Sequence, residues 1–411
     1  MTNAVGRSRT PVPRGLTRTG PVILSYGFRP FFLAAAIWGF GAMGLWVLAL
    51  SGSFTLSVAY GPTSWHAHEM LFGYSSAALA GFVLTTIPNW TGRLPVSGLP
   101  LLGLFLLWCA GRVALLCADI VGSVPAAAVD SIFLPVLFAV CAREIVGGKK
   151  WKDIKIVSGI LALSIANILF HYSVIGGYWT ATSSRLAISA YVMLIMIIGG
   201  RILPSFTRNW LSKRGEIRFP VPYNTFDTLS LVIALAALFA WVIKPEGPVT
   251  GVLCLAASAV QAFRLSRWRG WTTGAEGLVV ILHAAYGFVV LGFAAVAASA
   301  VGVFDPLSAL HVMTVGCIGT MTLAVMTRAT RGHTGLELHA SPITVASYGA
   351  MVFAALLRPI AGVLPDAYMA LVSLSGAAWI AAFLLYLIEY ARPLASKRKY
   401  ADVRQRGKDS A

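Results

Sequence analysis

The chain is poor in charged residues and poorer still in acidic ones. It has 32 Lys and Arg residues but only 15 Asp and Glu, and charged residues make up 11% of its 411 residues. Soluble globular domains carry about 25% charged residues. This shortage, together with a hydrophobic content of 57%, excludes a soluble globular domain for most of the chain. It predicts an all-α polytopic membrane protein whose main partner is the lipid bilayer.

Cysteine is also scarce, and no two cysteines form a C-x-x-C pair. The five cysteines lie inside or at the ends of apolar runs: Cys109, Cys117, Cys141, Cys254 and Cys317. This placement argues against a disulfide framework or a zinc ribbon and predicts small buried hydrophobic side chains.

The first 27 residues lack an apolar stretch followed by a cleavage site. We therefore expect a cytoplasmic arm there, and no cleaved signal peptide.

Long apolar runs fill the rest of the chain. A membrane-spanning helix needs about 20 predominantly apolar residues, and twelve segments fit. The predicted spans are 29–50, 66–88, 97–118, 125–145, 154–175, 183–204, 225–244, 247–265, 275–300, 306–328, 341–363 and 366–390. No segment between them is long enough for a separate soluble domain. The predicted organisation is a basic arm (1–27), one transmembrane domain (28–391) and a basic tail (392–411).

The basic residues support an even number of spans. With the amino terminus in the cytoplasm, all but four of the 32 Lys and Arg residues fall on the inner side; the outer four are Arg112, Arg185, Lys244 and Arg358. An excess of Lys and Arg on the cytoplasmic side is what the positive-inside rule describes for membrane proteins. It explains the net charge of +17 without nucleic acid as a partner. It predicts a multi-pass membrane protein with both termini in the cytoplasm.

A faint internal repeat relates spans two, six and ten. Setting His68 over His311 places Met70 on Met313, and a similar offset reaches Tyr191 in the sixth span. Three four-helix units around an axis normal to the membrane would give this pattern. That pseudo-threefold plan resembles the haem-copper oxidases. The histidine pairs that the oxidases carry on their middle helices are absent, which argues against an oxygen-reducing binuclear centre.

Histidines inside apolar spans are costly, so they indicate function. His68 and His311 lie at similar depth on different spans, which suits the two axial ligands of one haem. Imidazole also suits copper, and Met70, Met313 and Cys317 would add soft ligands for Cu(I). Arg112, in the outer part of the third span, is the predicted partner of the haem propionates.

His66 is a further candidate metal ligand, although it cannot share one metal with His68 on a regular helix. Residues two apart on an α-helix point about 200° apart. Either the helix starts at His68, or the two histidines serve different sites. Glu69 shares a helical face with His66 and could orient its ring, as carboxylates do for metal-bound imidazoles.

His171 and His283 complete the candidate metal ligands. His171 follows Asn167 by one turn in the fifth span, and ligand and structural roles are both open. His283 lies in the ninth span, one heptad after Glu276. It is either a metal ligand, a hydrogen-bonded packing residue or part of a small polar path.

Several stretches of the chain resemble the NnrS family of haem- and copper-containing membrane proteins of the bacterial nitric-oxide response. They are Gly27–Phe32, Trp65–Gly73, Pro88–Arg93, Gly199–Pro204 with Phe206–Trp210, and His311–Arg328 followed by Gly332–Gly335. The resemblance spans nearly the whole membrane region. It implies haem b and copper as cofactors, nitric oxide as a small-molecule ligand, and a role in resistance to nitrosative stress.

Two other functions fit the same composition. A proton- or ion-coupled secondary transporter would use Glu69, Asp130 and Glu276 with the histidines as proton or substrate groups. Such transporters break helices within the membrane, and interior prolines are few here, Pro135 being the clearest. The third possibility is an electron-transfer enzyme like nitric oxide reductase, against which the sparse histidines count.

Overall fold

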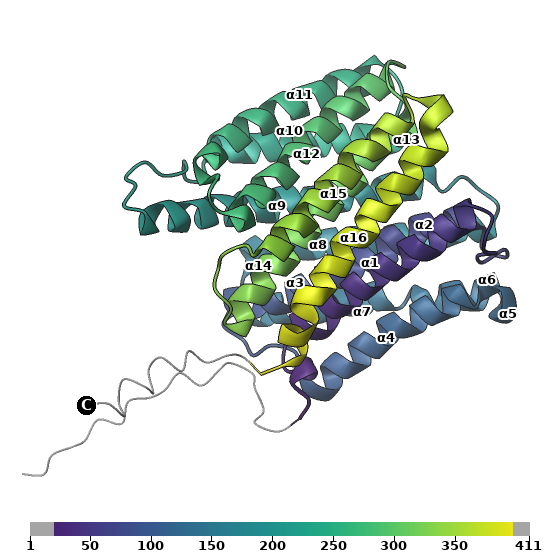
Figure 1. Ribbon diagram of the computed structural model, residues 1–411, viewed down its shortest axis with the longest axis horizontal. Helices are drawn as coiled ribbons and strands as arrows, with labels where there is room; N and C mark the ends of the chain where they lie inside the picture. Colours follow the sequence, from purple (N-terminus) through teal and green to yellow (C-terminus); the bar gives the residue numbers. More distant parts are fainter. Residues whose placement is uncertain (1–19, 398–411) are drawn as a thin grey trace, which may run out of the picture.

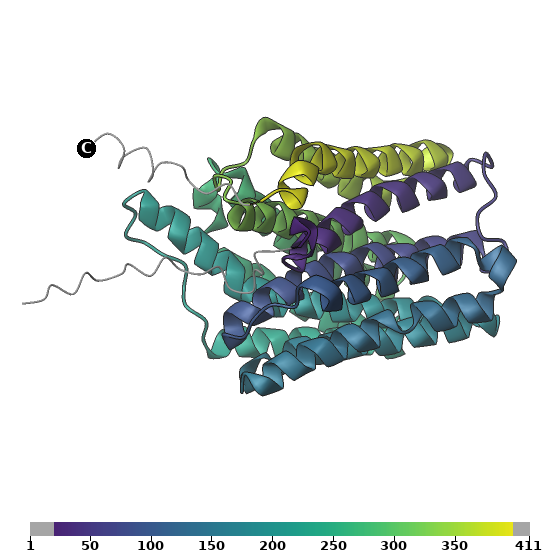
Figure 2. The same cartoon turned by 90° about the horizontal axis from the view of Figure 1, so that it is seen from below.

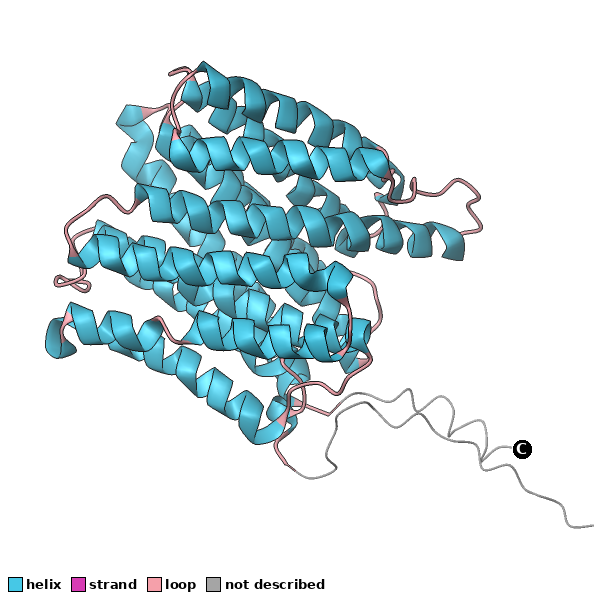
Figure 3. Cartoon of the chain, turned by 180° about the vertical axis from the view of Figure 1, so that it is seen from behind, coloured by secondary structure: helices cyan, strands magenta, loops and turns pink. Residues whose placement is uncertain are grey.

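The computed structural model describes residues 20–397, and every regular element in them is helical (Figure 3). The predicted arm up to residue 19 and the tail from residue 398 lie outside the described residues. The α-helices are α1 (Phe28–Leu50), α2 (Pro62–His68), α3 (Ser75–Thr91), α4 (Gly98–Leu116), α5 (Ala118–Val121), α6 (Ser123–Asp130), α7 (Phe133–Gly147), α8 (Ile154–Ile175), α9 (Ala181–Lys213), α10 (Thr225–Ile243), α11 (Pro248–Ser266), α12 (Gly277–Ala300), α13 (Pro306–His311), α14 (Thr320–Thr334), α15 (Pro342–Ala361) and α16 (Tyr368–Ala395). Two π segments, Glu69–Tyr74 and Val312–Gly319, and four short 3₁₀ turns, Val22–Leu24, Trp151–Asp153, Gly270–Thr273 and Pro365–Ala367, join them.

Twelve of the helical segments in residues 20–397 are long and apolar enough to cross a membrane, which confirms the predicted all-α fold and number of spans. Span two is Pro62–Thr91, built from α2, a π segment and α3; span ten is Pro306–Thr334, built from α13, a π segment and α14. Span four, Ser123–Gly147, combines α6 and α7. The other spans each contain one long α-helix.

Two prolines that were expected to end helices lie inside them. Pro88 and Pro204 were expected to end spans two and six, but both lie inside helices that continue to Thr91 and Lys213. A proline removes one backbone hydrogen bond from a helix. In a bundle, packing against neighbouring helices compensates for that loss, so the helix continues.

The first and last spans lie side by side, so both described ends of the chain are at the same end of the bundle (Figures 1 and 2). Nη1 of Arg29, at the start of α1, donates to the carbonyl oxygens of Leu394 and Ser396, each at 2.7 Å. These bonds satisfy carbonyls at the end of α16, which have no partner within their own helix.

Spans two, six and ten are the most buried of the twelve, with 83%, 67% and 67% of their most apolar stretches inside the protein. Spans two and ten each contain a π segment directly after His68 and His311, whereas span six is α-helical from Ala181 to Lys213. The threefold repeat and the oxidase-like plan therefore stay predictions.

One buried guanidinium ties four helices together near the end of the bundle where the chain begins and ends. Arg264 of α11 donates through Nε to Asp227 of α10 at 2.9 Å. Its Nη1 donates to the Met196 carbonyl of α9 at 3.0 Å and to the Tyr286 hydroxyl of α12 at 2.9 Å. Its remaining nitrogen, Nη2, faces Gly200 of α9.

We expect Gly200→Ala to lower the thermal stability of the detergent-solubilised protein by about 1–3 kcal/mol, as overpacking of a core does. A Cβ at Gly200 would lie 2.1 Å from Arg264 Nη2, and that guanidinium cannot move because Asp227 holds it. Gly199→Ala is the matched control, since the nearest atom there would be 3.5 Å away. Equal melting temperatures for the two variants would contradict this account.

Candidate metal centre

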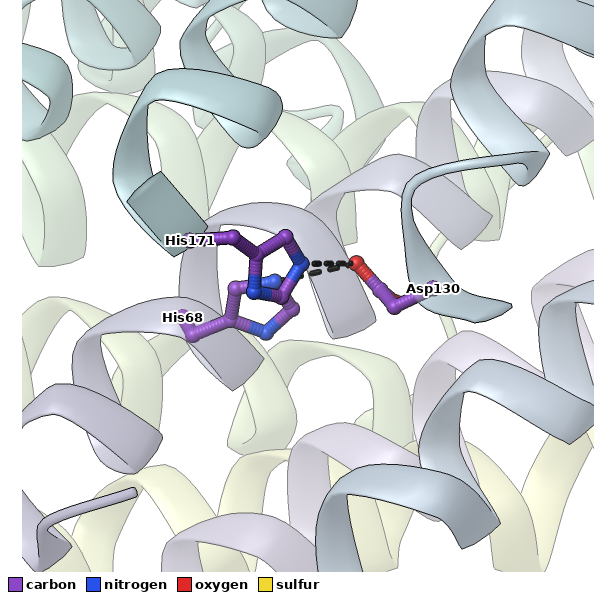
Figure 4. A group of neighbouring side chains, drawn as sticks. All are labelled: His68, Asp130 and His171. Atoms are coloured by element: carbon purple, nitrogen blue, oxygen red, sulfur yellow. Dashed lines mark hydrogen bonds and ion pairs between the residues drawn. The ribbon is translucent and has the colours of Figure 1, made fainter. Parts of the chain in front are cut away.

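His68, Asp130 and His171 form a buried group (Figure 4). The group joins spans two, four and five at the end of the bundle opposite the chain ends. His68 ends α2, Asp130 ends α6 and His171 lies in the last turns of α8. One ligand atom from each residue lies within 4.8 Å of the other two, and no more than 3% of any of the three residues is exposed. Within residues 20–397 this is the one such group of three or more His, Cys, Asp or Glu residues.

Both imidazoles point the same ring nitrogen at one carboxylate oxygen. Asp130 Oδ2 lies 3.1 Å from His68 Nε2 and 2.9 Å from His171 Nε2 (Figure 4). Asn167 completes the group, because its Nδ2 donates to the same oxygen at 2.9 Å and its Oδ1 lies 2.9 Å from His68 Nε2. Three nitrogens therefore converge on a single oxygen atom.

The other nitrogen of each imidazole has its own partner. Nδ1 of His68 lies 3.3 Å from Glu69 Oε1, and Nδ1 of His171 lies 2.8 Å from the Tyr60 hydroxyl. A metal-bound imidazole donates a hydrogen bond from its remaining N–H to such an acceptor, and this bond fixes the ring orientation and the tautomer. Burial, followed by the charge of Glu69, raises the pKa of Tyr60 well above its usual value. Its hydroxyl therefore stays neutral and can donate or accept.

The centre carries an excess of negative charge. Arg112 of α4 pairs with Glu69 Oε2 at 2.6 Å and with Asp130 Oδ1. Glu69 also accepts a hydrogen bond from Trp38 Nε1 of α1 at 2.5 Å. Two carboxylates face one guanidinium, so with neutral imidazoles the buried net charge is negative. An uncompensated buried charge is strongly unfavourable, and a bound cation would neutralise it.

The backbone of span two departs from α geometry directly after His68. In the π segment Glu69–Tyr74, side chains of other spans satisfy freed carbonyls: the Tyr191 hydroxyl donates to Leu71 O at 2.8 Å and Trp108 Nε1 donates to Gly73 O at 3.1 Å. π-bulges occur frequently at functional sites. Gly73 must stay small, because a Cβ there would lie 2.3 Å from Glu69 Oε2.

Span four is interrupted directly after Asp130. α6 ends at Asp130 and α7 begins at Phe133. Pro135 causes the break, because it has no N–H for the carbonyl of Ser131 and its ring would clash with that carbonyl. Ser131 and Ile132 keep right-handed helical dihedrals, so the irregularity after Asp130 is local and the span continues into α7.

The donor set fits a single metal ion and does not fit a haem. Two imidazole nitrogens and a carboxylate oxygen suit copper, zinc or iron(II). A haem between His68 and His171 would require the rings to stand on opposite faces of the macrocycle. Their centroids are 4.6 Å apart and both rings approach the same Asp130 oxygen from one side.

His66 and His311 lie outside this group. α2 begins at Pro62, so the reading in which the helix starts at His68 was wrong, and the two neighbouring histidines face different surroundings. The His66 ring stacks on Trp46 with centroids 4.4 Å apart, and its Nδ1 is buried without a partner. His311 Nδ1 lies 2.7 Å from the Leu307 carbonyl. His66 and His311 lie in the same region of the bundle.

The residues predicted to assist the metal and haem ligands also have contacts other than those expected. Glu69 contacts His68 rather than His66, because Arg112 and Trp38 hold its carboxylate on the side of the metal centre. Arg112, predicted to bind haem propionates, is occupied by carboxylates of the protein itself. Met70 is half-buried in the π segment of span two.

The remaining candidates lie elsewhere. Met313 is buried and packs against Gly292 of α12. His283 Nε2 lies 2.8 Å from the Thr207 hydroxyl, and the polar path to Glu276 does not form, because Glu276 pairs with His339 at 3.0 Å.

Sequence reasoning missed Asp130 as a partner of His68, and it missed Tyr60 and Trp38 altogether. The available signal for Asp130 was its position as a lone carboxylate in an apolar span, where an ionisable residue indicates a functional site by default. Tyr60 and Trp38 gave no such signal, since aromatic residues are common at the ends of membrane helices.

The family model described as NnrS protein matches residues 22–398 of the chain. No curated protein matches it significantly.

Proposed function

The chain belongs to the NnrS family, since the family match covers residues 22–398, and on this premise we propose that it is a haem- and copper-binding inner-membrane protein of the nitric-oxide response, with both termini in the cytoplasm. The observation that carries the proposal is the buried His68–Asp130–His171 group with its excess negative charge. We assign the copper ion to this group.

The donor chemistry supports copper. Imidazole suits copper, and copper(II) binds a given nitrogen and oxygen donor set more tightly than the other divalent first-row metals. When a metal binds Nε2 of each imidazole, the ring proton can reside on Nδ1. Glu69 and the Tyr60 hydroxyl are placed to accept a hydrogen bond from that N–H in His68 and His171 respectively. Three protein ligands leave a coordination position for a small ligand, for which nitric oxide is the candidate in this family.

We assign haem b to spans two and ten, through His66 and His311. Nδ1 of His66 has no partner, and the Leu307 carbonyl holds Nδ1 of His311, so its Nε2 is the nitrogen available for a ligand. Arg358 of α15 lies in the neighbourhood of both histidines. It is the better candidate for an anionic propionate, because Arg112 already pairs with two carboxylates. Bound haem would supply an iron that binds nitric oxide.

Metal analysis of the purified protein tests the copper assignment. We expect one copper ion per chain in the wild type, and about tenfold or greater loss of copper affinity in Asp130→Asn and His171→Ala, because each removes a ligand. His283→Ala is the matched control, being a buried histidine outside the centre. Full copper content in both ligand variants, or no copper in wild type produced with copper, would contradict the assignment.

The break in span four favours a second function, an ion-coupled transporter. Discontinuous helices at ion sites are a feature of such proteins, and span four has an irregularity at Ser131 and Ile132, directly after Asp130. Proteoliposomes would decide between the two, since a transporter would carry out cation-dependent uptake and its purified form would show no haem spectrum. An enzyme like nitric oxide reductase would instead consume nitric oxide when given a reductant.

A further inference from the structure

A cavity of about 70 Å³ lies between spans two, six and ten, the three most buried spans. α3 forms one wall and α9 the second, and the third is the end of the span-ten π segment with α14. Most wall side chains are aliphatic, as with Ala78, Ile198 and Met321. His68, Asp130 and His171 do not line it, so the cavity is separate from the metal centre.

The few polar groups in the wall are already engaged. Ser75 and Tyr191 donate to carbonyls of the span-two π segment at 2.7 and 2.8 Å. Thr322 donates to its own helix at 2.8 Å and contacts the Tyr74 hydroxyl. A buried water needs two to four polar partners, and the hydroxyl protons of these walls are already donated to carbonyls, so no free side-chain donor is left for a water. The cavity therefore favours an apolar occupant over water.

The size of the cavity limits the occupant. Sites for drug-sized ligands have volumes of about 300–1,000 Å³, so a volume near 70 Å³ excludes a quinone or a haem but admits a xenon atom or a diatomic molecule. Phe82 and Ile202 in the wall are only half-buried. The cavity is therefore not sealed, and a lipid-soluble gas can enter without unfolding of the bundle.

We propose that this cavity binds a small uncharged apolar molecule, a dissolved diatomic gas, and holds it beside span two. Ser75 in the wall follows His68 by seven residues, about 10 Å along a helix axis. A gas in the cavity is thus concentrated close to the metal centre. That the gas is nitric oxide depends on the proposed function, but binding of an apolar gas at this place does not.

Xenon is the probe, because it enters dry apolar cavities and is located in pressurised crystals by its anomalous scattering. We expect one xenon site between Ala78, Ile198 and Met321 in the wild type. Ala78→Leu and Val325→Phe each add side-chain volume to the wall and are expected to abolish the site. Ala284→Leu, on the exposed face of α12, is the matched control and should keep it.

The outcomes separate this inference from the proposed function. Absence of xenon from the wild-type cavity, an ordered water in its place, or full xenon occupancy in a folded filling variant would overturn the inference. Val325 is half-buried, so Val325→Phe provides the test if Ala78→Leu does not fold. Xenon binding needs no copper or haem. A protein that binds xenon but no metal would remove the proposed function alone.

Discussion

Arg112→Gln should make the stability of the protein depend on bound metal. In the metal-free variant, the carboxylates of Glu69 and Asp130 lose the guanidinium that pairs with both of them. Breaking a buried ion pair by removing one partner costs about 3–5 kcal/mol, because a buried charge is left uncompensated. The three metal ligands are untouched, and a bound cation replaces the lost positive charge. Added copper should therefore raise the melting temperature of the variant more than that of the wild type.

Thermal unfolding in detergent, with a chelator and then with copper, measures both effects. Arg143→Gln is the matched control, since Arg143 also pairs with a glutamate but its side chain is 66% exposed. A surface pair contributes about 0–1 kcal/mol, so this variant should unfold close to the wild type under both conditions. If copper stabilises Arg112→Gln no more than the wild type, the cation does not bind next to these carboxylates.

The fold was predictable because hydrophobic length is a direct property of sequence. Each span is a predominantly apolar run of the length that a bilayer requires, and all twelve predicted spans have a counterpart in the structure. The positions of span ends were less predictable. Pro204, for example, reads as a stop, but the continuation of α9 to Lys213 depends on packing against helices far away in the sequence.

The metal centre was only half predictable, and its partners show why. His68 could be singled out because an imidazole in an apolar span is costly. Its partners lie 62 and 103 positions later in the chain, at Asp130 and His171, and no local pattern indicates which spans meet. The π segment after His68 has no sequence signature comparable to a proline. His68 and His311 lie at similar depth in their spans, and this alone made them candidates for the same haem. Their different positions across the bundle place them in different surroundings.

His66→Ala and His68→Ala should therefore have opposite effects on the two cofactors. His68 belongs to the buried group with Asp130 and His171, so His68→Ala should lose copper and keep the haem spectrum. His66 has a buried nitrogen without a partner and is assigned to the haem with His311, so His66→Ala and His311→Ala should lose the haem spectrum and keep copper. Because the two residues lie in the same short helix, each variant is the control for the other.

Reduced-minus-oxidised spectra and metal analysis of the same preparations measure both cofactors. A haem signal that disappears in His68→Ala and persists in His66→Ala would contradict this division and restore the pairing of His68 with His311 across one haem. Loss of both cofactors in both variants would mean that the two sites are coupled through α2. The expected crossed pattern cannot arise from general unfolding, because a misfolded variant would lose copper and haem together.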